Sequence, residues 1–170
     1  VLGLMGDNGA GKSTLVKIIA GNFKQTSGQI NFEDEKVEFS KPMDARVRGI
    51  EIVYQDLALC DNLTASSNIF LTREIKRKVG PLSILNFKAM IDRAKDIFKE
   101  LKSETLPEEE VKMMSGGQRQ AVAIGRTKLS KAKVVLLDEP TAAISVRQVA
   151  EVLDLIKQLK AQGIAVLIIS

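Results

Sequence analysis

A glycine-rich segment near the start of the chain has residue types that bind phosphate. The eight residues from Gly6 to Ser13 are Gly-Asp-Asn-Gly-Ala-Gly-Lys-Ser, and they fit the pattern G-x-x-x-x-G-K-[ST]. Three glycines permit a tight turn in which successive backbone N–H groups point at one anion. In this pattern Lys12 supplies positive charge to the β- and γ-phosphates, and the Ser13 hydroxyl ligates Mg²⁺. The segment therefore predicts a site for a nucleoside triphosphate.

Two acidic residues follow an apolar run later in the chain. Asp138 and Glu139 come directly after Val134–Leu137. Because side chains on a strand alternate between its faces, we expect the two carboxylates to have different tasks. Asp138 is the candidate for holding Mg²⁺, and Glu139 is the candidate for polarising an attacking water. A strand that ends in solvated acids is the alternative, and the phosphate-binding segment in the same chain argues against it.

A third segment, Ser115-Gly116-Gly117-Gln118, lies 103 residues after Lys12 and 23 residues before Asp138. A Ser-Gly-Gly turn that opens a helix can bind an anion, although serine is also an ordinary helix cap. One nucleotide needs no second anion site from the same chain. The segment is therefore either a plain cap or a contact to a nucleotide held by another subunit.

The alternation of apolar and amphipathic stretches predicts the elements that position these residues. It is typical of a mostly parallel sheet with helices between its strands. The first third of the chain is predicted to form a buried strand at Val1–Met5, a helix at Lys12–Ala20 ended by Gly21, a hairpin of Gln29–Phe32 and Lys36–Phe39, a short helix between Pro42 and Gly49, and a strand at Ile50–Tyr54. A strand before the phosphate-binding segment and a helix after it are the context that this segment requires.

The middle of the chain is predicted to be a helical insertion at about residues 61–130. It holds helices at Thr64–Leu71 and Asn86–Leu101, with Gly80-Pro81 between them. The remaining elements are a helix at Gln118–Leu129, a strand at Val134–Leu137, a helix at Val146–Ala161 and a final strand at Ile164–Ile169. We expect one α/β domain over residues 1–170. Both end runs resemble core strands cut at their edges, so a segment of a longer protein is expected.

Composition excludes several classes of protein. With 170 residues, 45% hydrophobic and 27% charged, the chain can build a core without disulfides, and it is neither disordered nor collagenous. The apolar runs are shorter than the roughly 20 residues that a membrane helix needs. The net charge of +4 is spread out, which favours a solvated surface over a nucleic-acid patch. A single cysteine, Cys60, and the lack of a signal-peptide pattern favour the cytoplasm.

Taken in order, these segments resemble the ATPase subunit of an ATP-binding cassette (ABC) transporter. The matching motifs are Gly6–Ser13 (Walker A), Gln55 (Q-loop), Met114–Gln118 (signature) and Leu136–Glu139 (Walker B). Val53–Cys60 and Asp138–Ala143 further resemble bacterial importers of ribose-, xylose- or fructose-like sugars. The resemblance implies an α/β fold with a P-loop NTPase core, a mostly parallel sheet, an N-terminal antiparallel β part and a helical insertion.

The resemblance also implies an activity, its cofactors and its partners. Two cassettes would pair head to tail and hydrolyse ATP with Mg²⁺, as a homodimer or with a fused or paired second cassette. Gln55 would sense Mg²⁺ and the attacking water. The nucleotide contacts would come from Gly6, Asp7, Asn8, Gly9, Ala10, Gly11, Lys12, Ser13 and Thr14, and from Ser115, Gly116, Gly117 and Gln118 of the other copy. The partners would be a membrane permease and, indirectly, a periplasmic or extracellular sugar-binding protein, at the cytoplasmic face of the cell membrane, with no nucleic acid.

Two departures from the family pattern and two alternatives accompany this resemblance. The signature begins with Met114 where leucine is usual, and the segment after Walker B has Ser145 where aspartate is usual. Two further family elements, an adenine-stacking aromatic before Val1 and a histidine just beyond Ser170, would lie outside this sequence, which itself contains no histidine. The alternatives are a soluble ABC ATPase that acts on ribosomes or DNA, and a non-hydrolysing regulatory cassette. The spacing of 103 residues argues against the DNA-repair members, and intact Lys12 and Glu139 argue against the regulatory cassette.

Overall fold

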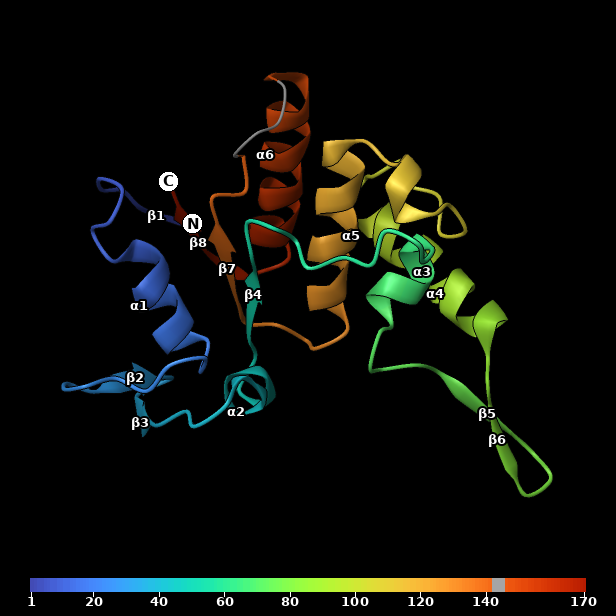
Figure 1. Ribbon diagram of the computed structural model, residues 1–170, viewed down its shortest axis with the longest axis horizontal. Coiled ribbons are helices and arrows are strands. Elements are labelled where there is room, and N and C mark those ends of the chain that lie inside the picture. Colours follow the sequence, from blue (N-terminus) through green and yellow to red (C-terminus); the bar gives the residue numbers. More distant parts are fainter. Residues whose placement is uncertain (142–145) are drawn as a thin grey trace.

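The computed structural model describes residues 1–141 and 146–170, and its centre is a four-stranded parallel sheet (Figure 1). The strand order is β1-β8-β7-β4. Their bounds are Leu2–Leu4 for β1, Ile50–Val53 for β4, Val134–Asp138 for β7 and Ala165–Ile169 for β8. Because all four strands are parallel, the segments that follow β1, β4 and β7 leave the sheet at the same edge.

Helices cover both faces of this sheet, which explains its continuous apolar strands. Leu136 packs in a cluster with Val16 of helix α1 (Lys12–Ile19), whereas Val135 and Leu137 pack in the cluster that holds helix α6 (Val146–Ala161). Since neighbouring side chains on a strand point to opposite faces, a strand buried on both faces needs apolar residues at every position. The mostly parallel α/β architecture predicted from the sequence is therefore confirmed.

An antiparallel part follows helix α1, as the sequence predicts. Strands β2 (Ile30–Phe32) and β3 (Glu35–Val37) form a hairpin, and Glu33 and Asp34 make its turn with positive φ values of 52° and 63°. The short helix α2 (Pro42–Val47) then leads into β4, and Gly49 between them has a φ of 93°.

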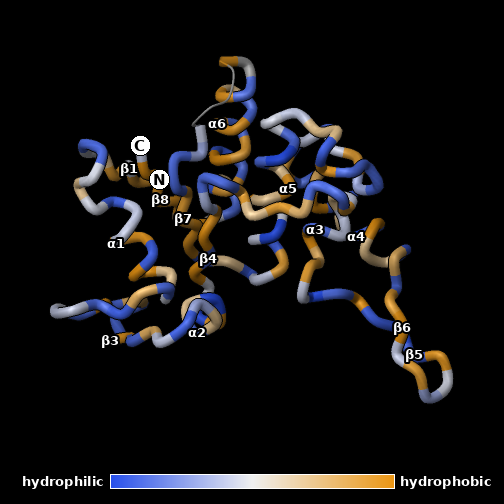
Figure 2. Tube along the Cα trace, in the orientation of Figure 1, coloured by the Kyte–Doolittle hydropathy of each residue, from blue (hydrophilic) through white to orange (hydrophobic). Residues whose placement is uncertain are grey.

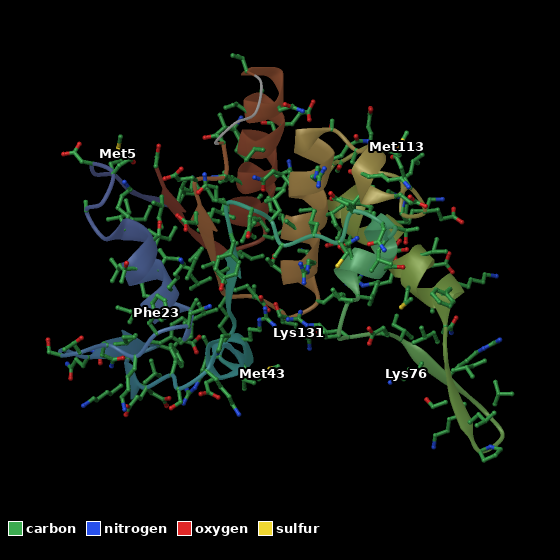
Figure 3. The ribbon with its side chains drawn as sticks, in the orientation of Figure 1. Met5, Phe23, Met43, Lys76, Met113 and Lys131 are labelled. Carbon is green, nitrogen blue, oxygen red and sulfur yellow. The ribbon has the colours of Figure 1, made fainter. Side chains whose placement is uncertain are left out.

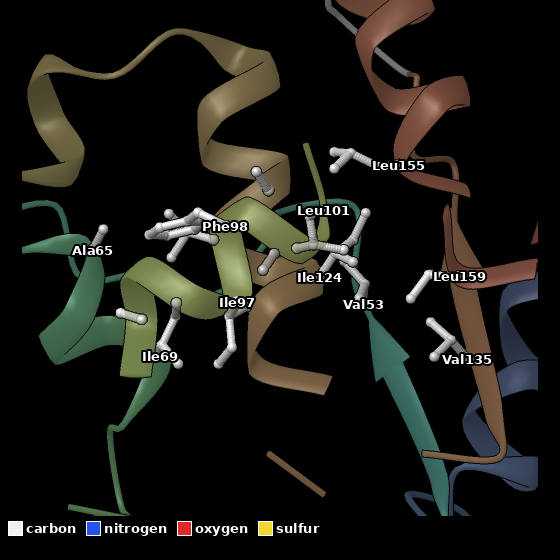
Figure 4. Packing of buried hydrophobic residues seen from close by; sticks show 14 of the residues in the cluster. Val53, Ala65, Ile69, Ile97, Phe98, Leu101, Ile124, Val135, Leu155 and Leu159 are labelled. Atoms are coloured by element: carbon white, nitrogen blue, oxygen red, sulfur yellow. The ribbon is translucent and has the colours of Figure 1, made fainter. Parts of the chain in front are cut away.

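The helical insertion packs around one apolar cluster. Helices α3 (Ala65–Ile69), α4 (Phe87–Glu100) and α5 (Gly116–Lys128) surround the buried side chains of Ile97 and Phe98 (Figure 4). Gly125 permits the close approach of these helices, because a Cβ atom there would lie 3.2 Å from both Ile69 and Ile97. A short 3₁₀ helix, η1 (Val111–Met113), precedes α5. No helix within the described residues is long and apolar enough to cross a membrane.

The structure adds one element that the sequence did not predict and corrects one expectation. The segment around Gly80-Pro81 is more than a separator between helices: it is the turn of an antiparallel hairpin of β5 (Lys76–Val79) and β6 (Leu82–Leu85). Strand β1 is also less buried than expected, since Leu2 is 68% exposed. The physical reason is its position at the edge of the sheet, where it pairs with β8 along one side.

Candidate nucleotide and metal site

The phosphate loop joins β1 to α1 and has the backbone geometry that anion binding requires. Gly9 and Gly11 have φ values of 85° and 88°, in the left-handed region that favours glycine. A Cβ atom built at either position would meet nothing within 4 Å, so the backbone there is open to an approaching ligand. Gly11 is the N-cap of α1, which directs the positive end of the helix dipole at the loop.

Lys12 lies folded against this loop. Its Nζ atom donates hydrogen bonds to the carbonyl oxygen of Gly6 and, at 3.2 Å, to that of Asp7. The ammonium group is therefore held among the loop's own carbonyl groups, beside the open backbone. Thr14, also assigned to the nucleotide by the resemblance, follows in the first turn of α1 with an exposed side chain.

The structure brings the phosphate loop and the end of β7 together. The Ser13 hydroxyl donates a hydrogen bond of 3.1 Å to Oδ1 of Asp138, across 125 positions of sequence. Asp138 is the last residue of β7 and only 7% exposed, so its carboxylate is aimed at α1 and not at solvent. A hydroxyl and a carboxylate beside a phosphate loop are the protein ligands that Mg²⁺ takes when phosphates and waters complete its octahedron.

Glu139 lies outside the strand, in a strained turn. Strand β7 ends at Asp138, and Glu139 has a φ of 46°. The sequence predicts that the two carboxylates differ in direction because they alternate on one strand. In the structure the difference comes from the left-handed turn at Glu139. Two hydrogen bonds hold the turn: the Glu139 N–H donates to the Ile169 carbonyl at 3.2 Å, and the Gln120 amide donates to the Pro140 carbonyl at 2.7 Å.

Gln55 lies at the same edge of the sheet. Val53 at the end of β4 is in register with Leu137 of β7, so the residues that follow the two strands leave the sheet side by side. Gln55 is in an exposed turn two residues after β4. The preceding Tyr54 donates a hydrogen bond of 3.0 Å from its hydroxyl to Asn22, which ties this turn to the end of α1.

The signature segment is a capped helix start. Ser115 is the N-cap of α5, and a capping box joins it to Gln118: the Gln118 N–H donates to Ser115 Oγ at 3.3 Å, and the Ser115 N–H donates to Gln118 Oε1 at 2.9 Å. Gly116 and Gly117 form the first turn. A Cβ atom at Gly117 would lie 1.9 Å from Oε2 of Glu151, so helix α6 approaches closely here.

One chain does not join its signature to its own phosphate loop. Met5, which precedes the loop, and Met113, which precedes the signature, lie on opposite sides of the molecule (Figure 3). The sheet and helix α6 lie between the two segments (Figure 1). The structure thus assembles the residues of the loop, β7 and the end of β4, and leaves Ser115–Gln118 apart. The departure at Ser145 lies outside the described residues.

Two buried polar groups near this site were missed from the sequence. Gln120 on α5 is 4% exposed, and its Oε1 is a buried atom without a hydrogen-bond partner in the described part of the chain. Glu51 in β4 is 5% exposed and pairs with Arg46 at 3.5 Å and Arg73 at 2.9 Å. The only signal for Glu51 was a charged residue inside the apolar run Ile50–Val53.

The arginine side chains around Glu51 line a pocket with the turn after β4. Arg126 of α5 belongs to this pocket and donates to the Ala58 carbonyl at 2.9 Å. Burial lowers the pKa of Arg126, and the nearby charges of Arg46 and Arg73 lower it further. The pocket therefore holds more positive than negative charge, and it lies between the sheet and the helical insertion.

Comparison with known proteins identifies the family. The profile of the ABC transporter family matches residues 1–142. A xylose/arabinose import ATP-binding protein of Sulfolobus acidocaldarius is 48% identical, over 100% of this chain and 66% of its own length. A fructose import ATP-binding protein of Rhizobium meliloti is 42% identical (100% and 67%), and a ribose import ATP-binding protein of Lactococcus lactis is 40% identical (98% and 33%).

Solved structures agree with this result. A nucleotide-free ATP-binding cassette from an ABC transporter superposes with a TM-score of 0.84 and 26% identity, covering 100% of this chain and 70% of that one. A dimeric cassette in a post-hydrolysis state, bound to ADP and phosphate, gives a TM-score of 0.75 and 26% identity, covering 99% and 73%. The chain belongs to the ABC transporter family and has the fold of its ATP-binding cassette. It spans about two thirds of the first two relatives and one third of the ribose import protein.

Proposed function

We propose that this protein binds and hydrolyses ATP to power the import of a simple sugar through a membrane permease. The observation that carries the proposal is the hydrogen bond between Ser13 and Asp138, because it joins the phosphate loop to the strand end that bears Glu139. The import relatives, similar over the full length of this chain, support the coupling to sugar transport.

ATP binding is assigned to the phosphate loop and the start of α1. The loop N–H groups of Gly6–Gly11 would surround the phosphates, and Lys12 would turn from the loop carbonyls to the β- and γ-phosphates. Ser13 and Asp138 would hold Mg²⁺, which supplies positive charge to the phosphate oxygens. Among the described residues no group of three or more Asp, Glu, Cys or His could hold a metal ion.

Hydrolysis is assigned to Glu139 and Gln55. The left-handed turn places the Glu139 side chain next to the strand end that bears Asp138, where its carboxylate would accept a proton from the attacking water. Gln55, from the neighbouring strand, would orient the same water and contact Mg²⁺. The two residues follow the ends of the parallel strands β4 and β7, where Val53 and Leu137 are in register, so a shift of β4 against β7 would separate them.

A second cassette is part of the proposal. Ser115–Gln118 are apart from the loop of their own chain, and a helix start with two glycines presents free N–H groups to an anion. In a head-to-tail pair these N–H groups would contact the ATP held by the partner. A dimeric cassette is among the structures that this chain resembles.

The remaining partners are a permease and a sugar-binding protein, at the cytoplasmic face of the membrane. The pocket between the sheet and the helical insertion, adjacent to the turn with Gln55, is the surface we assign to the permease. The relatives named above are import proteins, which favours this role over ribosome- or DNA-directed ATPases and over a regulatory cassette.

The test is reconstitution of the full-length protein in proteoliposomes with the permease encoded beside it. ATP enclosed in the vesicle lumen, on the cassette side, should drive uptake of one of xylose, arabinose, fructose or ribose when the sugar-binding protein is present outside. Glu139→Gln should abolish uptake and hydrolysis together. Hydrolysis that responds to ribosomes or DNA, and to none of the sugars with the permease, would reject the proposal.

A further inference from the structure

The hairpin of β5 and β6 projects from the helical insertion into solvent (Figure 1). All eight of its strand residues are exposed. Figure 2 shows hydrophobic residues along this hairpin, well away from the cores on either side of the sheet. An isolated two-stranded hairpin is marginally stable in water, so contact of its apolar residues with a partner surface would stabilise it.

The apolar residues gather at the tip and on one face. Residues opposite each other in the register share a face, which places Arg77, Val79, Leu82 and Ile84 together. Val79 and Leu82 flank the turn at Gly80-Pro81 and are 50% and 66% exposed. The tip is therefore an apolar wedge of two aliphatic side chains.

Positive charge lies directly behind this tip. Residues 76–85 contain Lys76, Arg77 and Lys78 and neither aspartate nor glutamate. In the part of the chain that the structure covers, none of these three cations has an ion pair. The β2–β3 hairpin differs, because two of its three acidic residues pair with cations: Glu33 with Lys133 and Glu35 with Arg48. The backbone hydrogen bonds that the Glu74 carboxylate accepts lower its pKa, and the nearby charge of Lys76 lowers it further, whereas Arg77 and Lys78 are free to act on a partner.

The root of the hairpin is fixed to the body of the protein. The Asn86 N–H donates to the Ile75 carbonyl at 2.8 Å, and the Ile75 side chain packs on the apolar cluster of the insertion. Two residues earlier, Arg73 donates to Glu51 at 2.9 Å and to the Arg126 carbonyl at 3.4 Å. The hairpin is therefore anchored to the helical insertion at its root.

We propose that this hairpin binds the anionic surface of a lipid bilayer. Val79 and Leu82 enter the headgroup region, and Lys76, Arg77 and Lys78 contact lipid phosphates behind them. Apolar side chains next to uncompensated cations are the combination that binds anionic membranes. In Figure 1 the hairpin and the phosphate loop lie at opposite ends of the molecule, so this contact leaves the nucleotide site accessible. The inference goes beyond the proposed function and does not depend on the sugar.

The test is flotation of the full-length protein, without permease, with vesicles of phosphatidylcholine alone or mixed with phosphatidylglycerol. The protein should bind the mixed vesicles and lose that binding in 1 M salt. Because each cation near an anionic surface strengthens binding by roughly fivefold, K76E/R77E/K78E should lower the partition coefficient by at least about a hundredfold, since it removes three cations and adds three anions. V79S/L82S, which keeps the charge, should lower it about tenfold.

A matched control distinguishes an effect of the hairpin's charges from an effect of the protein's net charge. K95E/K99E/K160E makes the same charge change at exposed lysines of α4 and α6, and it should bind the mixed vesicles within twofold of the parent. All variants should keep the parental affinity for MgATP. Three results would overturn the proposal: no binding by the parent, an equal loss in the control, or normal vesicle binding by hairpin variants that no longer co-purify with the permease. The last result would assign the hairpin to a protein surface.

Discussion

Lys12 has two sets of possible acceptors, the carbonyl oxygens that it bonds in this structure and the phosphates that the loop is shaped to hold. Its removal leaves the glycine backbone in place, since that geometry depends on Gly9 and Gly11. Lys12→Ala should therefore fold normally and bind MgATP about 10- to 100-fold more weakly, the cost of a lost hydrogen bond to a charged group.

Titration with a fluorescent ATP analogue measures this affinity. Lys17→Ala, five residues later on the same helix, is the control for removal of one lysine charge from α1. Equal affinities of Lys12→Ala and the parent would contradict the assignment of the loop.

Glu139 should affect turnover far more than binding. Its backbone is held by the Ile169 carbonyl, so Glu139→Gln keeps the turn and removes only the charge of the side chain. Hydrolysis by the full-length protein should fall by roughly 10²–10⁴-fold, the range for a lost general base, while MgATP affinity stays within a few-fold.

Release of phosphate at saturating ATP is the measurement, and Glu108→Gln at an exposed position is the control. Parental hydrolysis by Glu139→Gln would show that another residue is the base.

Helix α5 links the signature segment to the turn that contains Glu139. It begins at the signature and, one turn later, its Gln120 side chain holds the Pro140 carbonyl beside Glu139. Gln120→Met keeps the volume and removes this hydrogen bond. We expect kcat to fall about 10- to 100-fold through displacement of the Glu139 turn, with KM for ATP little changed.

A purely structural role for Gln120 would lower the thermal midpoint and leave kcat per folded molecule unchanged, so both quantities are measured. Gln25→Met, at a half-buried position between α1 and β2, is the matched control. An unchanged kcat in Gln120→Met would contradict a positioning role.

The elements differ in how well local sequence predicts them. The β2–β3 hairpin is predictable because the polar residues 33–35 interrupt two apolar runs, and helix α6 because its apolar residues repeat at helical spacing. The β5–β6 hairpin is not predictable in this way, because Lys76-Arg77-Lys78 shows no apolar alternation and Gly80-Pro81 is equally compatible with a simple separator between helices. The burial of β1 was overestimated because a sequence does not say which strand takes the edge.

The residues of the candidate site also differ in how well the local sequence predicts them. The loop, Asp138 and Glu139 are predictable because their chemistry depends on neighbours in sequence. Gln120 and Glu51 were missed because their roles depend on partners brought near only by the fold: Pro140 for Gln120, and Arg73 for Glu51. Charged and amide side chains inside a core have no sequence pattern of their own.

At the scale of the whole molecule, the separation of loop and signature predicts that hydrolysis needs two copies. Ser115→Arg removes a helix cap, which costs about 1 kcal/mol, and places a large side chain where the partner's nucleotide would lie. Each chain should still bind MgATP at its own loop but hydrolyse almost none. Ser27→Arg, in an exposed loop, controls for the added arginine.

A mixture of two inactive variants distinguishes a head-to-tail pair from a monomeric enzyme. In a mixed pair, one site combines the altered loop of the Lys12→Ala chain with the altered signature of the Ser115→Arg chain, and it is inactive. The other site combines the intact loop of the Ser115→Arg chain with the intact signature of the Lys12→Ala chain. Half of the pairs in an equimolar mixture are mixed, and each has one of two sites intact, so hydrolysis should recover to about a quarter of the parental rate if the sites act independently. The recovery should increase with protein concentration, because it requires association, whereas each variant alone stays inactive at every concentration. A mixture as inactive as its components at all ratios and concentrations would contradict the arrangement in which Ser115–Gln118 act on the nucleotide of the other copy.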